Sequence, residues 1–390
     1  MNTRPIRVLH VLGSLNRGGA ETWLLNVLRH IDRDRFRLDF AVHTDQPAAH
    51  DNEARALGAR ILPCLSPHRP LRYLRNLRRI LRSEGPYDVV HSHVHHFSGI
   101  VLCQAHRCGV PTRLAHSHSD TSGPDRAAGM ARRGYLKLTE RLVRRHATLG
   151  LAASGKAATA LFGSGWRDDP RWRTHYCGID LQPFRETSDR DLLRREIGLP
   201  LDATVVGHVG RFVPPKNHRF LLDVFAELSR RLPLAHLVLI GDGEERPAIE
   251  GFVRRLGLEG SVTFAGLRSD VPRLLSGAVD VFAFPSLHEG LGLALLEAQA
   301  AGLPCVLSDA VPTEVDVVLP LMRRIPLDGP RDAWVAAILD AIGRPRGVPQ
   351  RAAALAALEE SDFNIRNSVR RLEDLYSGTL RTDDGGARRP

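Results

Sequence analysis

Cysteine is rare in this sequence of 390 residues. The five cysteines are widely scattered, and an odd number of distant cysteines argues against a disulfide framework and indicates a reducing compartment. They are Cys64, Cys103, Cys108, Cys177 and Cys305.

Long apolar runs are missing as well. No run approaches the roughly 18 residues that a membrane-spanning helix needs. The short apolar run over residues 6–12 is followed at once by Gly13, Asn16 and Arg17, which is unlike a signal peptide. We therefore expect a cytoplasmic protein, whose contact with the inner face of the cell membrane, if any, is peripheral.

Aromatic residues and lysines are also scarce. Aromatic side chains make up 6% of the sequence, and no aromatic-plus-basic platform for single strands is present, so we expect no nucleic-acid partner. The net charge is +10, yet only Lys137, Lys156 and Lys216 are lysines among 54 basic residues. A positive surface attracts nucleic acid, acidic lipids and phosphorylated substrates alike, so charge alone selects none of them.

Strand and helix patterns alternate along the chain and restart near Thr204. This pattern predicts an α/β protein with two facing domains and a ligand site in the cleft between them. We expect an N-terminal domain over 1–182, a C-terminal domain over 183–362, a last helix over 363–377 and a disordered tail over 378–390.

A polar, glycine-bearing loop over 13–19 joins the first expected strand to the first helix. It has neither the G-x-G-x-x-G of a dinucleotide site nor the G-K-[ST] of a P-loop. Gly18 and Gly19 could let a phosphate approach the backbone, or they could only form a tight turn.

The stretch 279–309 predicts strand, loop, helix and strand, with the helix starting near Gly290. Gly290 and Gly292 would let an anion approach backbone amides at the helix N-terminus. With Glu289 and Glu297 on one helix, their carboxylates would be roughly 12 Å apart along the axis, which suits a long polar ligand. Alternatively, Glu289 is an ordinary first-turn glutamate and Glu297 a solvated one.

A second loop, over 210–216, carries Arg211 and Lys216 at the end of an expected strand. Two fixed cations there could stabilise a diphosphate leaving group, although either alone would be read as an exposed loop cation. Asn217 is expected to cap the helix that follows.

Histidines gather at two expected strand ends. His116 and His118 follow one strand, where ligands bind in parallel α/β sheets. The run His91, His93, His95 and His96 precedes Cys103, His106 and Cys108, but this spacing matches no common structural zinc site. Two D-x-D triplets, 32–34 and 189–191, fall in surface connections, so we read them as solvated charge and expect no metal.

The segment 70–83 predicts a basic amphipathic helix. Its leucines, Leu71, Leu74, Leu77 and Leu81, would form one face. Its arginines would either be solvated or contact an anionic membrane; they are Arg72, Arg75, Arg78, Arg79 and Arg82.

In this order, the motifs resemble those of retaining family 4 glycosyltransferases with the GT-B fold. The segments are GGAE, RLAHSHS, the G-R…K pattern and PSLHEGLGLALLEAQAAGLP with its E-x7-E core. Ser119 stands where many members carry Asp, and Cys177 replaces the Asn of the N-G-[IV]-D turn. The segments HVLGSLNRGGAET, AHSHSD and LEAQAAGLPCVLSD resemble most the exopolysaccharide-type, EpsF-like branch.

The resemblance implies a GT-B enzyme of two facing Rossmann-like domains whose C-terminal helix crosses back to the first. It implies metal-independent hexosyl transfer from a nucleotide diphosphate sugar, expected to be a UDP-sugar, to a saccharide or lipid-linked acceptor in polysaccharide or glycoconjugate biosynthesis. The implied catalytic residues are His118, Arg211, Lys216 and Glu289. The implied donor-binding residues are Gly18, Gly19, Arg211, Lys216, Arg268, Glu289, Gly290, Leu291, Gly292 and Glu297. The implied acceptor-side residues are Glu21, His116 and His118.

Other functions remain open from the sequence. A sugar-nucleotide epimerase on the same two-domain plan would need no acceptor, and a related transferase could act on a soluble natural product. A scaffold without activity would bind nucleotide without turnover.

Overall fold

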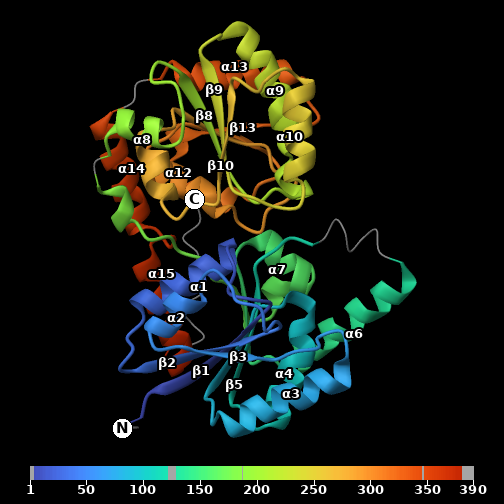
Figure 1. The fold of residues 1–390 in the computed structure, drawn as a ribbon. Helices are drawn as coiled ribbons and strands as arrows, with labels where there is room; N and C mark the ends of the chain where they lie inside the picture. Colours follow the sequence, from blue (N-terminus) through green and yellow to red (C-terminus); the bar gives the residue numbers. More distant parts are fainter. Residues whose placement is uncertain (1–3, 122–128, 187, 345–346, 380–390) are drawn as a thin grey trace. The chain divides into compact units, whose positions relative to one another are not determined.

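The computed structural model describes residues 4–121, 129–186, 188–344 and 347–379. It contains two compact units. Unit 1 comprises the chain up to Gly178 together with the segment from Ile365, and unit 2 comprises Ile179–Asn364. The tail expected to be disordered lies almost entirely outside the described residues (Figure 1).

Unit 1 is built on a seven-stranded sheet in which every pair of neighbours is parallel. The strand order is β3-β2-β1-β4-β5-β6-β7. The strands are β1 (Ile6–Leu12), β2 (Phe36–Val42), β3 (Arg60–Pro63), β4 (Val89–Ser92), β5 (Thr112–Ser117), β6 (Leu149–Ala152) and β7 (Trp172–Thr174).

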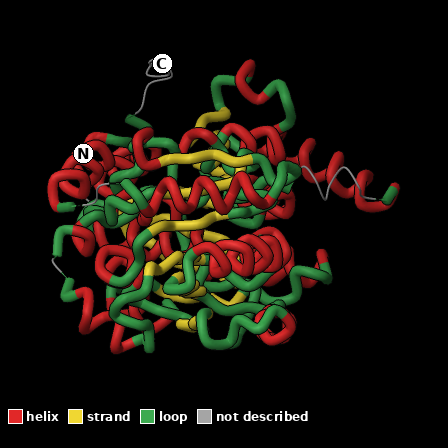
Figure 2. Tube along the Cα trace, turned by 90° about the horizontal axis from the view of Figure 1, so that it is seen from above, coloured by secondary structure: helices red, strands yellow, loops and turns green. Residues whose placement is uncertain are grey.

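Helices cover both faces of this sheet (Figure 1), and Figure 2 shows strands in yellow with helices in red beside them. Alternate residues of β1 point to opposite faces: Leu9 and Val11 join the apolar core under α3, α4, α6 and α7, whereas His10 lies near Tyr376 of α15, which packs on α1. The helices are α1 (Gly19–His30), α2 (Asp51–Ala56), α3 (Pro70–Ser83), α4 (Ser98–Arg107), α6 (Met130–His146), α7 (Gly155–Phe162) and α15 (Ile365–Ser377).

Unit 2 repeats the plan with a six-stranded parallel sheet in the order β10-β9-β8-β11-β12-β13. Its strands are β8 (Thr204–Val209), β9 (Ala235–Ile240), β10 (Val262–Gly266), β11 (Val281–Phe284), β12 (Cys305–Ser308) and β13 (Met322–Ile325). Its helices are α8 (Arg190–Glu196), α9 (His218–Arg231), α10 (Arg246–Arg255), α11 (Val271–Gly277), α12 (Leu293–Ala300), α13 (Arg331–Ile342) and α14 (Val348–Glu360).

The inner strands are apolar runs because helices bury both of their faces, as is usual for parallel sheets. Every residue of β9, β11 and β12 is buried. In both sheets the order reverses beside the first strand, between β1 and β4 and between β8 and β11. Ligands of such sheets bind beyond the carboxyl ends of the strands at this switch point.

The last helix, α15, returns to unit 1, as the sequence predicts. Trp23 of α1 donates its indole N–H to Ser368 at 3.3 Å. The hydroxyl of Tyr376 lies 2.7 Å from Nδ1 of His91 on β4. The C-terminal segment therefore completes one face of the first sheet.

Candidate active site

In unit 2, the loops that follow β8 and β11 are joined at the switch point. The backbone N–H of Leu287 donates to the carbonyl of Pro215 at 2.8 Å. The side-chain amide of Asn217 donates to the carbonyl of Pro285 at 3.2 Å. These two bonds hold Lys216 and Glu289, one on each loop, at a fixed separation.

Lys216 and Glu289 form a close ion pair. Nζ of Lys216 lies 2.6 Å from Oε1 of Glu289, and their side chains are only 19% and 10% exposed. The ammonium also lies 4.9 Å from the ring centroid of Phe284, the last residue of β11. A lysine ammonium has three N–H donors, so this pair leaves donors for an anionic ligand.

Arg211 lies on the same loop as Lys216 and is exposed. Within the described residues its guanidinium has no hydrogen bond or ion pair. The two cations predicted from the sequence therefore lie on one loop at the end of β8, one paired and one available.

The helix of the β11–β12 connection starts later than the sequence suggests. Helix α12 begins at Leu293, after Gly292 with φ of 100°, so Glu289 lies in the loop before the helix and Leu291 is buried there. The expected axial spacing of the two carboxylates was therefore wrong, and so was the alternative that Glu289 is a first-turn glutamate. Gly292 needs a left-handed backbone, which favours glycine.

Glu297 lies within α12 and is partly buried. Its carboxyl group has no hydrogen bond or ion pair among the described residues. Burial raises its pKa to about 7. A partly buried carboxylate without a protein partner is less well solvated than an exposed one, and hydroxyl donors of a ligand would stabilise its ionised form.

Arg268, expected in the donor site, follows β10 and is held by a neighbour. Its guanidinium makes two hydrogen bonds of 2.8 Å to the carboxylate of Asp270. The salt bridge fixes the loop after β10 at the same edge of the sheet as Lys216.

In unit 1, Gly18 and Gly19 form the start of α1. Gly18 is the N-cap with an extended backbone, φ of −164°, and neither glycine has a positive φ. A strained turn therefore does not explain them. A Cβ on Gly18 would lie 2.3 Å from the carboxylate of Glu21, so this glycine allows Glu21 to fold back over the helix start.

Histidines of unit 1 form one cluster at the carboxyl ends of β1, β4, β5 and β7. His10 pairs in register with His91, and the two H-S-H segments, 91–93 and 116–118, point to the same face because strand side chains alternate. The cluster, called here the histidine cluster, consists of His10, His91, His93, His116, His118 and His175 around Trp23.

Ring nitrogens within the histidine cluster lie at hydrogen-bond distance. Nδ1 of His10 is 2.9 Å from Nε2 of His93, and Nδ1 of His93 is 2.8 Å from Nε2 of His118. Nε2 of His91 is 3.1 Å from Nδ1 of His116. Burial lowers the pKa of His118 and that of His10 to about 3, and it lowers the pKa values of His91, His93 and His116 well below the usual value, so these imidazoles are neutral.

His116 and His118 were predicted as site residues, but His10, His91 and His93 were not predicted as their partners. The run 91–96 was instead compared with Cys103, His106 and Cys108, which are near in sequence. Within the described residues, the groups of side chains that could hold a metal contain histidines from different strands and none of these last three. The repeated H-S-H on neighbouring parallel strands could have predicted that these histidines lie together.

Both D-x-D triplets are turn or cap residues. Asp32 accepts a hydrogen bond from the backbone N–H of Asp34 at 3.0 Å. Asp189 caps α8 by accepting from the N–H groups of Asp191 and Leu192. These carboxylates therefore have a local structural role.

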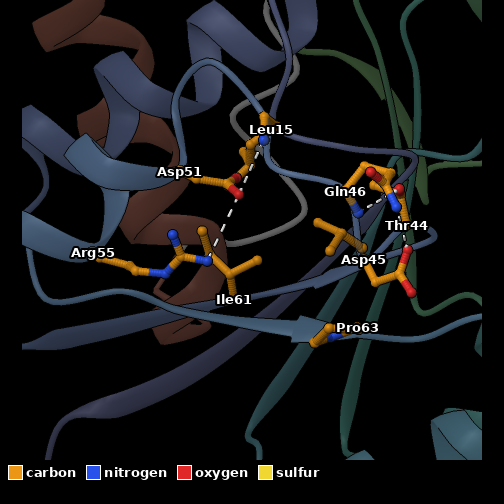
Figure 3. Close-up of a pocket in the computed structure, with 10 residues that line it drawn as sticks. Leu15, Thr44, Asp45, Gln46, Asp51, Arg55, Ile61 and Pro63 are labelled. Carbon is orange, nitrogen blue, oxygen red and sulfur yellow. Dashed lines mark hydrogen bonds and ion pairs between the residues drawn. The ribbon is translucent and has the colours of Figure 1, made fainter.

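A small hollow lies beside the loop after β1 (Figure 3). Leu15, Thr44 and Gln46 line it, together with Asp51 and Arg55 of α2. None of the residues predicted for the site lines this hollow.

Helix α3 has the predicted bounds, but its buried face is not the predicted face of four leucines. Tyr73, Leu77, Ile80 and Leu81 are buried, whereas Leu71 is 78% exposed. Leu71 lies six residues before Leu77, which places it roughly 120° around the helix. The five arginines are exposed and make no ion pair within the described residues. No described helix combines the length and apolar character required to cross a membrane.

Known proteins resemble the chain along both halves. Residues 18–178 match the family described as glycosyl transferase 4-like domain, and residues 189–352 match glycosyl transferases group 1. The chain is 35% identical, over 98% of its length and 99% of the relative, to a Bacillus subtilis protein provisionally named glycosyltransferase EpsF.

One further relative matches part of the sequence, and one solved structure has the same fold. Over 34% of this chain and 35% of the relative, the sequence is 35% identical to the Escherichia coli UDP-Gal:α-D-GlcNAc-diphosphoundecaprenol α-1,3-galactosyltransferase. The crystal structure of Anabaena HepE with UDP-glucose matches 96% of this chain and 100% of that one, with a TM-score of 0.78 and 23% identity. Because both halves match and one relative aligns along nearly its full length, the chain belongs to the family 4 glycosyltransferases with the GT-B fold.

Proposed function

We propose that this glycosyltransferase transfers a sugar, with retention and without a metal, from a UDP-sugar to a lipid-linked saccharide in polysaccharide or glycoconjugate biosynthesis. The observation that carries the proposal is the Lys216–Glu289 pair, held at 2.6 Å at the switch point of unit 2. It combines a cation for a diphosphate with a carboxylate for sugar hydroxyls. The UDP-glucose complex of HepE and the galactosyltransferase relative support the choice of UDP.

The donor would bind through its phosphates, sugar and ribose. Lys216 and Arg211 would neutralise the diphosphate, and the first-turn amides of α12 would add donors, because helix N-termini favour anions. Glu289 would hold the sugar hydroxyls. Glu297, partly buried and without a hydrogen bond or ion pair in the part of the chain that the structure describes, would accept hydrogen bonds from the ribose, and the loop of Arg268 would contact the base.

Transfer would break the bond between the anomeric carbon and the phosphate oxygen while the acceptor oxygen forms its bond on the same face. The acceptor proton would pass to the departing phosphate oxygen. Arg211 and Lys216 stabilise the charge that develops on that phosphate, which is the main electrostatic requirement of the step. His118, His116 and Glu21 of unit 1 would contact sugar or acceptor.

The acceptor is proposed from chemistry and charge. The Escherichia coli relative acts on a diphosphoundecaprenol-linked sugar, and a lipid-linked acceptor requires access to a membrane surface. Five exposed arginines on α3 without ion-pair partners in the described structure fit a peripheral contact with anionic lipid.

A binding panel tests the donor proposal. Isothermal titration with UDP-, GDP-, ADP- and TDP-glucose should give the tightest binding for the UDP-sugar. Lys216→Ala should weaken it about 10- to 100-fold, because a hydrogen bond to a charged group contributes roughly 1.5–3 kcal/mol. Lys137→Ala, an exposed lysine of α6, is the matched control and should bind as the wild type does.

Product analysis then separates the rival functions. Incubation with donor alone should leave the sugar configuration unchanged, whereas an epimerase would convert it. With a polyprenyl-diphosphate-linked acceptor, NMR of the product should show the donor's anomeric configuration, and EDTA should not reduce the rate. If the protein binds none of the four nucleotide sugars, the proposal is wrong.

A further inference from the structure

Three histidines of the histidine cluster bring one ring nitrogen each close together. They are His93 after β4, His116 at the end of β5 and His118 just beyond it. One nitrogen from each can be chosen so that the three lie within 4.8 Å of one another. Nε2 of His116 is buried and has no hydrogen-bond partner in the described structure.

We propose that His93, His116 and His118 bind a divalent transition-metal ion that prefers imidazole ligands, with Zn²⁺ as the physiological candidate. The site would use Nδ1 of His93 and Nε2 of the other two. The assignment is independent of the donor site in unit 2.

The outer nitrogens of these rings support the assignment. Metal-binding histidines almost always donate their second N–H to a neighbouring acceptor, which orients the ring. Here Nε2 of His93 faces His10 at 2.9 Å, and Nδ1 of His116 faces His91 at 3.1 Å. Nδ1 of His118 faces the sulfur of Cys177 at 3.6 Å. Each proposed ligand therefore has its outer partner in place.

The inner distances also suit a metal. Nδ1 of His93 and Nε2 of His118 are 2.8 Å apart. Two nitrogens bound to one Zn²⁺ at about 2.0–2.1 Å in tetrahedral geometry lie roughly 3.3 Å apart, so the ion could replace this hydrogen bond after a shift of about half an ångström. Imidazole is a ligand that Zn²⁺, Cu²⁺ and Co²⁺ share.

A second group of histidines, His10, His91 and His93, also meets the distance criterion. His10 and His91 are fully buried, whereas His93 and His118 are partly exposed at the sheet edge. An ion can therefore reach the proposed site more directly. Three protein ligands leave the fourth position open, and bound metal would occupy the nitrogen of His118 that could otherwise face sugar or acceptor.

Cobalt substitution tests the site. The full-length protein, without a polyhistidine tag and after treatment with EDTA, is titrated with Co²⁺ and followed by visible absorption. We expect one Co²⁺ per chain, displaced by one equivalent of Zn²⁺. His116→Gln and His118→Gln should each lower Co²⁺ affinity by at least about tenfold, because loss even of an outer partner costs 10- to 100-fold.

His106→Gln is the matched control. His106 and His146 form a ring pair at 5.1 Å on α4 and α6, away from the strand ends, and its loss should leave the affinity unchanged. Thermal melts followed by circular dichroism identify the variants that fold. Because His118 is partly exposed, we expect His118→Gln to disturb folding less than His116→Gln. The proposal would be overturned if folded His118→Gln bound Co²⁺ with the affinity of the wild type, or if the wild type bound no Co²⁺. It would also be overturned if only His106→Gln lost affinity for Co²⁺.

Discussion

At the scale of single residues, Glu297 gives the proposed donor site a dependence on pH. Burial raises its pKa to about 7. Ribose hydroxyls would donate to the ionised form, so bound donor would lower this pKa again. Below pH 7 the carboxyl must lose its proton before it accepts these hydrogen bonds, and affinity is lost as the pH falls.

We therefore expect the affinity for UDP-glucose to rise between pH 6 and pH 8 with an apparent pKa of about 7. A sugar nucleotide is the proper probe because its esterified diphosphate keeps a constant charge over this range, whereas a terminal phosphate titrates near pH 6. Isothermal titration at several pH values measures the profile.

Glu297→Gln should bind more weakly at pH 8 and lose the pH dependence. Glu227→Gln, a glutamate of α9 paired with Arg231, should keep the wild-type profile. A pH-dependent profile that persists in Glu297→Gln would assign the titration to another group.

At the scale of elements, the sequence predicted what local patterns determine. Helix α3 has its predicted bounds because apolar periodicity and Pro70 both define it. The start of α12 was wrong by three residues because small, apolar residues on both sides of Gly292 gave no boundary signal.

Contacts between side chains far apart in the chain could not be predicted from local sequence patterns. Asn217 was expected to cap α9, but it has a left-handed backbone and makes no cap hydrogen bond. Its side chain instead reaches Pro285 of a loop far along the chain. The pairing of Lys216 with Glu289 likewise depends on strand order, which local patterns do not determine.

Gly292 gives a prediction at this scale. Its φ of 100° places Ala in the left-handed region at a cost of about 1–2 kcal/mol in the free energy of unfolding. Because Gly292 is the N-cap of α12, Gly292→Ala should also displace the first-turn amides and weaken UDP-glucose binding. Urea denaturation and isothermal titration measure the two effects.

Gly251, inside α10, is the matched control for backbone geometry. Its added Cβ would meet only the guanidinium of Arg254, at 3.7 Å, and Gly→Ala inside a helix stabilises by up to about 1 kcal/mol. Gly251→Ala should therefore raise stability and leave binding unchanged. Equal effects of the two substitutions would contradict the role of the left-handed backbone.

At the scale of the whole molecule, two repeated α/β units were predictable because strand and helix patterns alternate twice. The family assignment confirms the GT-B class and the transferase activity. The histidine cluster was not predicted, because its members come from β1, β4, β5 and β7 and meet only through the parallel order of the sheet.

The net charge of +10 leads to the last prediction, on membrane contact. Each basic residue near an anionic surface contributes about 1 kcal/mol, so Arg72→Gln/Arg75→Gln/Arg79→Gln on α3 should lower affinity for phosphatidylserine vesicles about 100-fold. Vesicle co-sedimentation at low and high salt measures this, since salt screens exposed charges. Arg230→Gln/Arg254→Gln/Arg255→Gln removes the same charge from exposed positions of unit 2 and should have a much smaller effect. Equal losses in the two triple variants would mean that overall charge, and not α3, determines vesicle binding.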